Sequence, residues 1–150
     1  MIILVYDFNL KNTHTRLIMI ISLFLTVISY DIWFYFMHRL FHTKLLYKYH
    51  KKHHEYVISK REAATYGTLV DNGLTSCGGI IVFFILPINI YGCIIGNIYV
   101  YLRGFVLHCP ILLNNYYLKK IYTDHHLKHH LYFNCNYGQE WLDSLFGTSY

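Results

Sequence analysis

Three clusters of histidines are the residues of this chain whose types and spacing could do chemistry. They read HRLFH, HKKHH and HLKHH and begin at His38, His50 and His126. Within each cluster the histidines are three or four positions apart, and on a helix residues at that spacing lie on one face. Each cluster can therefore direct its imidazoles toward a shared point. Because neutral imidazole is the commonest metal ligand among side chains, the pattern predicts a metal site.

The number of clustered histidines indicates more than one metal ion. The clusters contain eight imidazoles, and one more histidine, His108, stands alone: His38, His42, His50, His53, His54, His126, His129, His130 and His108. A tetrahedral zinc takes at most four ligands and a catalytic zinc three. Eight or nine nitrogens suit two metal ions with five or six ligands each. Imidazole binds zinc, copper, iron and nickel, and a site beside a membrane without thiolate ligands favours redox iron.

Other interpretations account for some of these residues. His14 and His125 are expected to be interfacial residues at a membrane surface, with no part in the metal site. A basic, histidine-rich segment could also bind lipid headgroups, which would explain the lysines between positions 44 and 52. That alternative does not explain why the HxxHH pattern occurs in two separate segments.

The composition narrows the class of protein that carries these clusters. Of the 150 residues, 55% are hydrophobic, 19% aromatic and 14% charged, which excludes a disordered chain. The formal charge of +5, from 13 Lys and Arg against 8 Asp and Glu, is too sparse for binding to nucleic acid. The four cysteines form no CxxC pair, so neither a disulfide framework nor a redox pair is expected.

Long apolar segments must position the clusters. Leu17 to Met37 is nearly continuous apolar sequence, and about 20 such residues span a bilayer. A second apolar block is interrupted by Pro87 and predicts a hairpin of two helices, about 73–86 and 89–107. A re-entrant hairpin and a buried helix of a soluble protein are the alternatives. We therefore expect an all-α integral membrane protein, with residues 1–150 as a single domain.

The topology places the histidine clusters together. One span before His38 and one hairpin before His108 leave segments 38–71 and 108–150 on the same side of the membrane. Segment 38–71 carries seven Lys and Arg and segment 1–16 carries two, so the positive-inside rule predicts a cytosolic helical cap rich in histidine. The first residues lack the basic start of a signal peptide, so no cleavable leader is expected.

The order of these motifs resembles the fatty acid hydroxylase/sterol desaturase superfamily of integral-membrane di-iron enzymes. HRLFH, HKKHH and HLKHH are split by an apolar hairpin, and the sequence DIWFY precedes the first cluster. The tail HHLYFNCNYGQEWLDSLFGTSY, with its NYG and LFGT motifs, is most similar to sterol C5-desaturases. The resemblance covers about residues 25–150.

The resemblance implies a function and the residues that perform it. The eight clustered histidines are implied as iron ligands and as the catalytic centre, and His108 lies where many members have a further histidine. Two iron ions would use O₂ to oxidise an unactivated C–H bond of a sterol or fatty acyl lipid, giving an alcohol or a double bond. Side chains alone cannot perform this oxidation. Electrons would come from an external donor of the cytochrome b5 type, and the expected location is the endoplasmic reticulum.

The chain also departs from the pattern of the family. Many members have a His-Pro-x-Glu run near the start of the hairpin, where this chain reads GTLVD and Asp71 takes the place of the glutamate. Members usually carry more N-terminal membrane helices, so we expect close to a bare catalytic core. The alternative is a catalytically decayed or shortened membrane protein that binds metal or lipid. A membrane zinc hydrolase would need a motif such as HExxH, which is absent.

Two further expectations concern the neighbours of the ligands. Carboxylates should orient the imidazoles by accepting their second N–H, and the sequence offers four candidates: Asp31, Glu55, Asp124 and Glu140. The basic loop 44–61 could receive an acidic electron donor through complementary charge.

Overall fold

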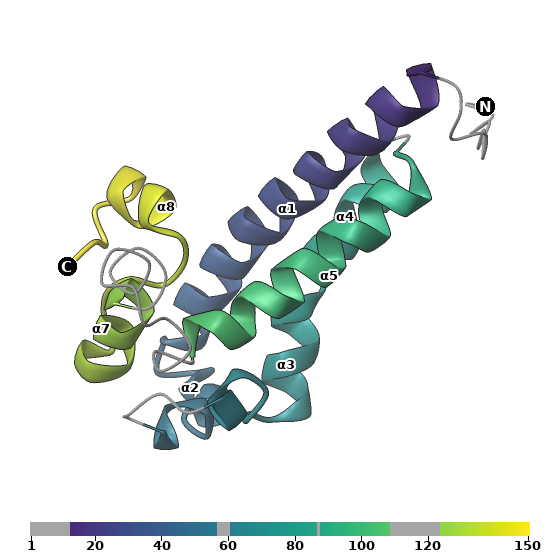
Figure 1. Cartoon of the computed structure of the whole chain (residues 1–150). Coiled ribbons are helices and arrows are strands. Elements are labelled where there is room, and N and C mark those ends of the chain that lie inside the picture. Colours follow the sequence, from purple (N-terminus) through teal and green to yellow (C-terminus); the bar gives the residue numbers. More distant parts are fainter. Residues whose placement is uncertain (1–12, 57–60, 87, 109–123) are drawn as a thin grey trace.

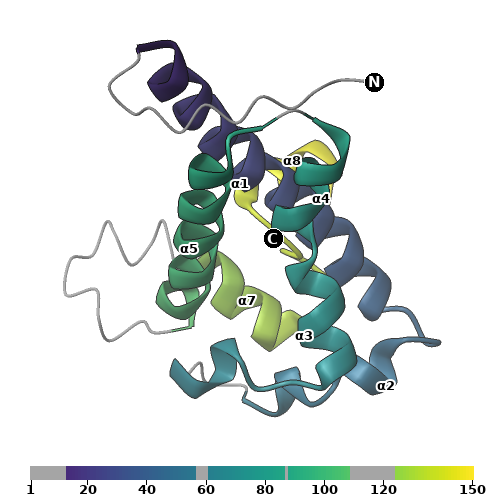
Figure 2. The same ribbon diagram turned by 90° about the vertical axis from the view of Figure 1, so that its right-hand side faces the viewer.

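A long apolar helix and a bent helical hairpin form the body of the protein. The structure, a computed structural model, describes residues 13–56, 61–86, 88–108 and 124–150, and this part of the chain contains helices and no strands. Helix α1 (Thr13–Phe41) runs the length of the molecule, and α3 (Leu69–Ser76), α4 (Gly78–Ile85) and α5 (Ile90–Leu107) pack along it (Figures 1 and 2). The all-α prediction is confirmed.

Two of these helices are long and apolar enough to cross a membrane. They span His14–Phe41, with a mean hydropathy of 2.1, and Ile90–Leu107, with a mean hydropathy of 1.5. Helix α1 covers the predicted segment 17–37 and continues to Phe41, so its last turn carries His38 and leads into His42. Together with the comparisons given below, these helices describe an all-α membrane protein.

The hairpin differs from its prediction in the first arm. We expected one helix over about 73–86, but the arm consists of α3 and α4, which meet at Cys77. Glycine explains why this arm lies close to α1: a Cβ at Gly78 would lie 2.7 Å from Cβ of Trp33. The second arm, α5, agrees with the predicted 89–107. Pro87, which predicted the turn, lies outside the described residues.

The start of α5 is held by a cap and by α1. The side chain of Asn89 accepts hydrogen bonds from the backbone N–H groups of Tyr91 and Gly92, at 3.0 and 3.2 Å, as an N-cap residue does. Its own N–H donates to Oγ of Ser22 in α1, at 2.8 Å. Because α3 and α4 run back along α1 before α5 begins, α1 and α5 run in the same direction.

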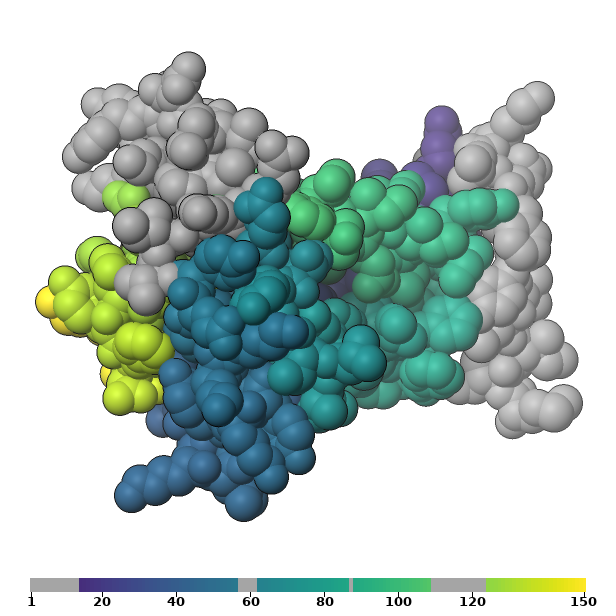
Figure 3. Space-filling view, turned by 90° about the horizontal axis from the view of Figure 1, so that it is seen from below, coloured from purple at the N-terminus to yellow at the C-terminus, as the bar shows by residue number. Residues whose placement is uncertain are grey.

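The short helices gather where α1 and α5 end. They are α2 (Tyr47–His50), η1 (His53–Glu55), η2 (Arg61–Ala64), α7 (Asp124–Tyr132) and α8 (Glu140–Leu145). Seen from this end, the side chains of residues 42–56 lie next to those of α7 (Figure 3). The segments that follow α1 and α5 thus meet at one end of the molecule, as the topology argument predicted. This end holds the histidine clusters.

Candidate metal centre

Nine histidines converge at this end into two adjoining groups. Group A consists of His38, His42, His50, His54 and His129, and group B of His53, His108, His126 and His130. Within each group, one ring nitrogen per residue lies within 4.8 Å of the others. All nine except the half-buried His42 are buried. All nine histidines predicted as metal ligands are therefore brought together, including His108.

The groups do not follow the clusters of the sequence. We expected helical spacing to direct the imidazoles of each cluster toward a shared point, but HKKHH does not lie on one helix. Helix α2 ends at His50, and the next two histidines lie on the 3-10 helix η1. His54 therefore packs against His42 of group A, with ring centroids 4.9 Å apart, whereas His53 packs against His108 of group B, at 5.2 Å. The last cluster is divided as well, because His129 joins group A.

The Nε2 atoms point toward one another within each group. In group A these atoms are separated by 3.0 Å for His38 and His50, 3.1 Å for His50 and His54, 3.2 Å for His42 and His54, and 3.2 Å for His54 and His129. In group B they are separated by 2.8 Å for His108 and His126, and 3.1 Å for His126 and His130.

Backbone carbonyls decide which nitrogen of several rings faces inward. A carbonyl oxygen only accepts, so an Nδ1 that contacts one must carry the proton, and its Nε2 then keeps a free lone pair. Four histidines are held this way: His38 by Tyr137 O at 2.5 Å, His129 by Cys135 O at 2.7 Å, His108 by Gly104 O at 2.8 Å and His53 by Tyr66 O at 3.3 Å. This arrangement is the usual one around metal-binding histidines.

Electrostatics keeps the imidazoles neutral. Burial, followed by repulsion from neighbouring histidines, lowers the pKa of His42 and of His130 to about 2. Burial likewise lowers the pKa of His108 to about 4 and that of His129 to about 3. Neutral imidazoles with lone pairs converging in a buried space are a donor set that fits a transition metal ion. Both groups could therefore hold metal.

One carboxylate also orients a histidine of these two groups, and it is Asp71. Its Oδ2 accepts from Nδ1 of His50 at 2.9 Å, and both side chains are buried. Thr68 caps α3 and accepts from the N–H of Asp71 at 3.1 Å, which places the carboxylate at the start of the helix. Asp71, which the resemblance suggested in place of a glutamate, thus lies beside a candidate ligand.

The four carboxylates expected in this role do not perform it. Asp31 pairs with Arg103 of α5, and Glu55 accepts from the hydroxyl of Tyr66 at 2.8 Å. Among the described residues, no hydrogen bond joins Asp124 or Glu140 to a histidine. These four carboxylates are close in sequence to the histidines, but the packing of the helices decides which side chains face the two groups.

Asp143 is a functional residue that the sequence analysis missed. Its fully buried carboxylate accepts from Tyr137 N at 2.7 Å, Gly138 N at 2.9 Å, Thr148 Oγ1 at 2.7 Å and His125 Nε2 at 3.0 Å. It thereby holds the loop whose carbonyls orient His38 and His129. His125 belongs to neither histidine group, as expected, and its ring pairs with this carboxylate. The NYG and LFGT motifs on either side of Asp143 were the available indication.

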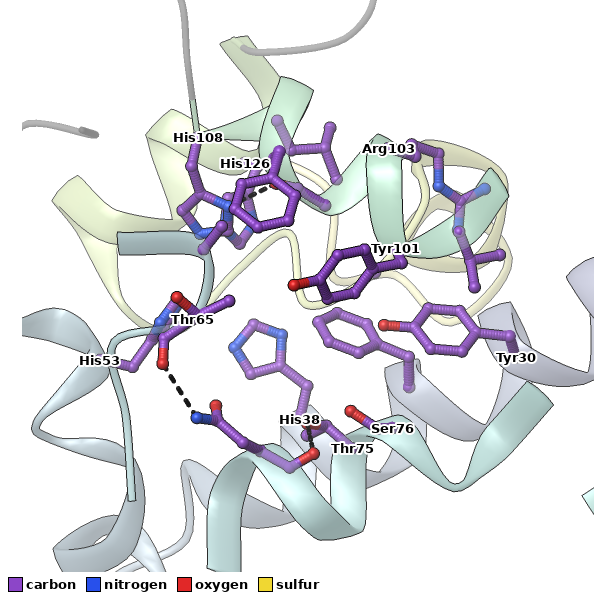
Figure 4. Close-up of a pocket in the computed structure, with 18 of the residues that line it drawn as sticks. Tyr30, His38, His53, Thr65, Thr75, Ser76, Tyr101, Arg103, His108 and His126 are labelled. Carbon is purple, nitrogen blue, oxygen red and sulfur yellow. Dashed lines mark hydrogen bonds between the residues drawn. The ribbon is translucent and has the colours of Figure 1, made fainter. Parts of the chain in front are cut away.

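A cavity of about 220 Å³ adjoins both groups. Its walls come from α1, α3 and α5, and its histidine side is formed by His38 and His50 of group A with His53, His108 and His126 of group B (Figure 4). Apolar side chains such as Phe34, Val100 and Phe105 line other parts. A bound molecule would therefore contact both groups at once.

The fold and the site together define an all-helical membrane protein with two adjoining histidine groups that could hold metal ions. The chain belongs to the fatty acid hydroxylase family, because the model of that family matches residues 23–148. This result confirms the resemblance inferred from the histidine motifs.

Curated relatives support the same membership. A Delta(7)-sterol 5(6)-desaturase of Gibberella zeae is 29% identical over 133 residues, covering 85% of this chain and 41% of the relative. The methylsterol monooxygenase 1 of Gallus gallus is 34% identical over 128 residues, covering 79% and 42%. That of Rattus norvegicus is 33% identical, covering 79% and 43%. The chain thus spans less than half the length of these relatives. No solved structure gives a significant match.

Proposed function

We propose that this chain forms the di-iron centre of a membrane-bound oxidoreductase that uses O₂ to desaturate or hydroxylate a lipid. The supporting observation is that two adjoining groups of buried imidazoles border one cavity. The substrate would be a sterol or a fatty acyl chain. Sterol C5-desaturation is favoured, because the relatives include Delta(7)-sterol 5(6)-desaturases.

Group A would hold one iron ion and group B a second, each through the Nε2 atoms of its histidines. Zinc fits imidazole equally well but has no redox chemistry, so the names of the relatives favour iron. When bound, the two ions would supply, with O₂, the oxidant for a C–H bond that no side chain can break. Electrons would come from an external donor.

Other residues of the protein would orient the imidazole ligands and limit the access of water to the site. The carbonyls of Tyr137 and Cys135 and the carboxylate of Asp71 hold three imidazoles of group A in one tautomer and orientation. Burial of the histidines limits the access of water to the iron site. The C–H bond of a substrate bound in the cavity would then be the bond that is oxidised. His38 and His53, which line the cavity from different groups, would face the reacting carbon.

The electron donor would approach the cap from outside the membrane. Lys44, Lys48 and Lys51 are exposed on the segment that covers the histidines, and an acidic donor of the cytochrome b5 type would be attracted to them. By the positive-inside rule this cap would lie in the cytosol, and the proposed membrane is that of the endoplasmic reticulum. If charge reversal at these lysines left donor-supported turnover and its salt dependence unchanged, this docking surface would be wrong.

Sterol profiling together with metal analysis tests the proposed function. The chain is expressed in a yeast that lacks its own sterol C5-desaturase, and sterols and hydroxylated acyl chains are then profiled. We expect a restored 5,6-double bond, two irons per purified chain and loss of product in His53→Ala. The exposed His14→Ala is the matched control and should remain active. Zinc without any oxidation product would instead favour a decayed protein that binds metal or lipid.

A further inference from the structure

The cavity carries a polar wall opposite its histidines. Tyr30 of α1, Ser76 of α3 and Tyr101 of α5 all line it. In Figure 4 the hydroxyl oxygen of Tyr101 points into the space in front of His38, and that of Tyr30 points toward the same side of the cavity, where Phe34 packs against both Tyr30 and His38. Three different helices thus bring hydroxyl groups to the same cavity.

The two tyrosine hydroxyls have no hydrogen-bond partner within the described part of the chain. Their rings pack against aromatic neighbours: Tyr30 stacks on Phe34, with centroids 5.7 Å apart, and Tyr101 packs edge-on against Phe105, at 4.9 Å. Other polar groups of the wall are already bonded. Thr75 donates to the backbone oxygen of Asp71 at 2.8 Å, and Arg103 pairs with Asp31.

Unpaired hydroxyls on membrane-spanning helices favour a ligand that can bond to them. Both tyrosines lie on helices long and apolar enough to cross a membrane, where Tyr30 is half-buried and Tyr101 is 59% exposed. Where hydrocarbon surrounds these helices, no bulk water competes for the hydrogen bonds of the two hydroxyls. The remaining wall includes Phe34, Val100 and Phe105. A largely apolar cavity with a few inward polar groups suits an apolar molecule that carries one polar group.

We propose that the hydroxyls of Tyr30 and Tyr101 bind the hydroxyl group of a lipid alcohol, which places a carbon a few bonds away against the histidines. This inference rests on the proposed function and narrows its substrate class. In a sterol, the hydroxyl on C3 is separated from C5 by a single ring carbon, so a sterol offers both the polar group and the carbon to be oxidised at one end of the molecule. The middle of a plain fatty acyl chain has no polar group and would leave both tyrosines unpaired.

The test compares a Δ7-sterol with its 3-deoxy counterpart, which lacks only the hydroxyl. Equilibrium binding of each radiolabelled sterol to the purified chain in nanodiscs is measured first, because it does not depend on turnover. Oxidation of each sterol by the iron-loaded protein with a reductant is measured second. The variants are Tyr30→Phe, Tyr101→Phe and the double variant. The control is Tyr99→Phe, on the same helix as Tyr101 but outside the cavity lining.

A neutral hydrogen bond is worth up to about tenfold in affinity. We expect the wild-type chain and Tyr99→Phe to bind the sterol at least about tenfold more tightly than the deoxy compound. Each single variant should lower this ratio several-fold, and the double variant should bring it within about twofold of unity. Equal affinities in the wild-type chain, or an unchanged ratio in the double variant, would overturn the proposal.

The two measurements separate this inference from the proposed function. A hydroxyl-dependent binding ratio without any oxidation product would refute the oxidoreductase and leave the tyrosine subsite standing. Oxidation of both sterols at equal efficiency, with equal binding, would refute the subsite and leave the oxidoreductase standing.

Discussion

Replacing Asp143 by asparagine should lower the stability of the protein and weaken metal binding by group A, although Asp143 does not contact that group. The carboxylate contacts no member of either histidine group, yet its two oxygens accept four hydrogen bonds within the C-terminal segment. Asparagine keeps the shape but turns one oxygen into an NH₂ group. That group then faces a backbone N–H, of Tyr137 or of Gly138, and leaves this donor buried without a partner.

The size of the effect follows from these bonds. An unsatisfied buried donor costs about 1–3 kcal/mol, and losing the charge weakens the bonds that remain, so a total of about 3 kcal/mol is expected. At about 2–4 °C per kcal/mol for a chain of this size, the thermal midpoint in detergent should fall by about 6–12 °C. Glu140→Gln, an exposed position on the same helix, should leave it unchanged.

The same substitution should weaken metal binding selectively. The loop that Asp143 holds supplies the carbonyls of Tyr137 and Cys135, which orient His38 and His129 of group A. Loss of such outer contacts typically lowers metal affinity about 10–100-fold. Titration with a chelator should therefore remove the metal of group A earlier than in the wild-type chain. An Asp143→Asn variant with unchanged midpoint and unchanged metal retention would refute the reasoning.

The pH dependence of this difference provides a second check. Burial alone would raise the pKa of Asp143, but hydrogen bonds from His125, Thr148 and the backbone of Gly138 and Tyr137 lower it below its ordinary value of 3.8. A lowered folded-state pKa contributes stability that is present above the ordinary value and is lost as the pH falls below it. The gap in thermal midpoint between wild type and Asp143→Asn should be constant above about pH 5 and shrink below about pH 4. A gap that widens in acid would contradict the assignment.

Three further single substitutions and one double variant test other parts of the molecule. Asp71→Asn removes the charge that orients His50 and should lower metal affinity about 10–100-fold in a chelator titration, whereas unchanged affinity would exclude this role. Arg103→Met leaves Asp31 unpaired between α1 and α5 and should destabilise the protein by about 3–5 kcal/mol, seen as a lower thermal midpoint. Adding Asp31→Asn should recover much of this loss, and a double variant as unstable as the single one would argue against the pair. Gly92→Ala should also lower the midpoint, because its Cβ would lie 2.2 Å from a backbone oxygen of α1; a neutral effect would show that the two helices can separate freely.

Much of the site could be predicted because helical spacing is a local property. HLKHH lies on α7, where its three histidines are all buried, and HRLFH ends α1 as its spacing required. The lengths of the apolar segments likewise predicted α1 and α5. Each of these predictions depends only on the rise and turn of one helix and on residues at most a few turns apart.

The partners of the histidines could not be predicted in the same way. His38 contacts the carbonyl of Tyr137, 99 positions further along the chain, and His50 contacts Asp71, 21 positions away. Asp31 satisfied the periodicity argument but faces Arg103 of a neighbouring helix. The partner of each side chain depends on how α1, α3 and α5 pack, and sequence spacing carries no information about that packing.

By itself, the sequence predicted the candidate metal site of this protein: clustered histidines beside segments apolar enough to enter a membrane. The tertiary structure decided how those histidines are divided between two groups. Because α2 ends at His50 and a 3-10 helix follows, neighbouring His53 and His54 join different groups. The tertiary structure also brought in His108 and set Asp143 behind the loop that holds group A. These choices are made by contacts between distant segments, whose geometry exists only once the helices have packed.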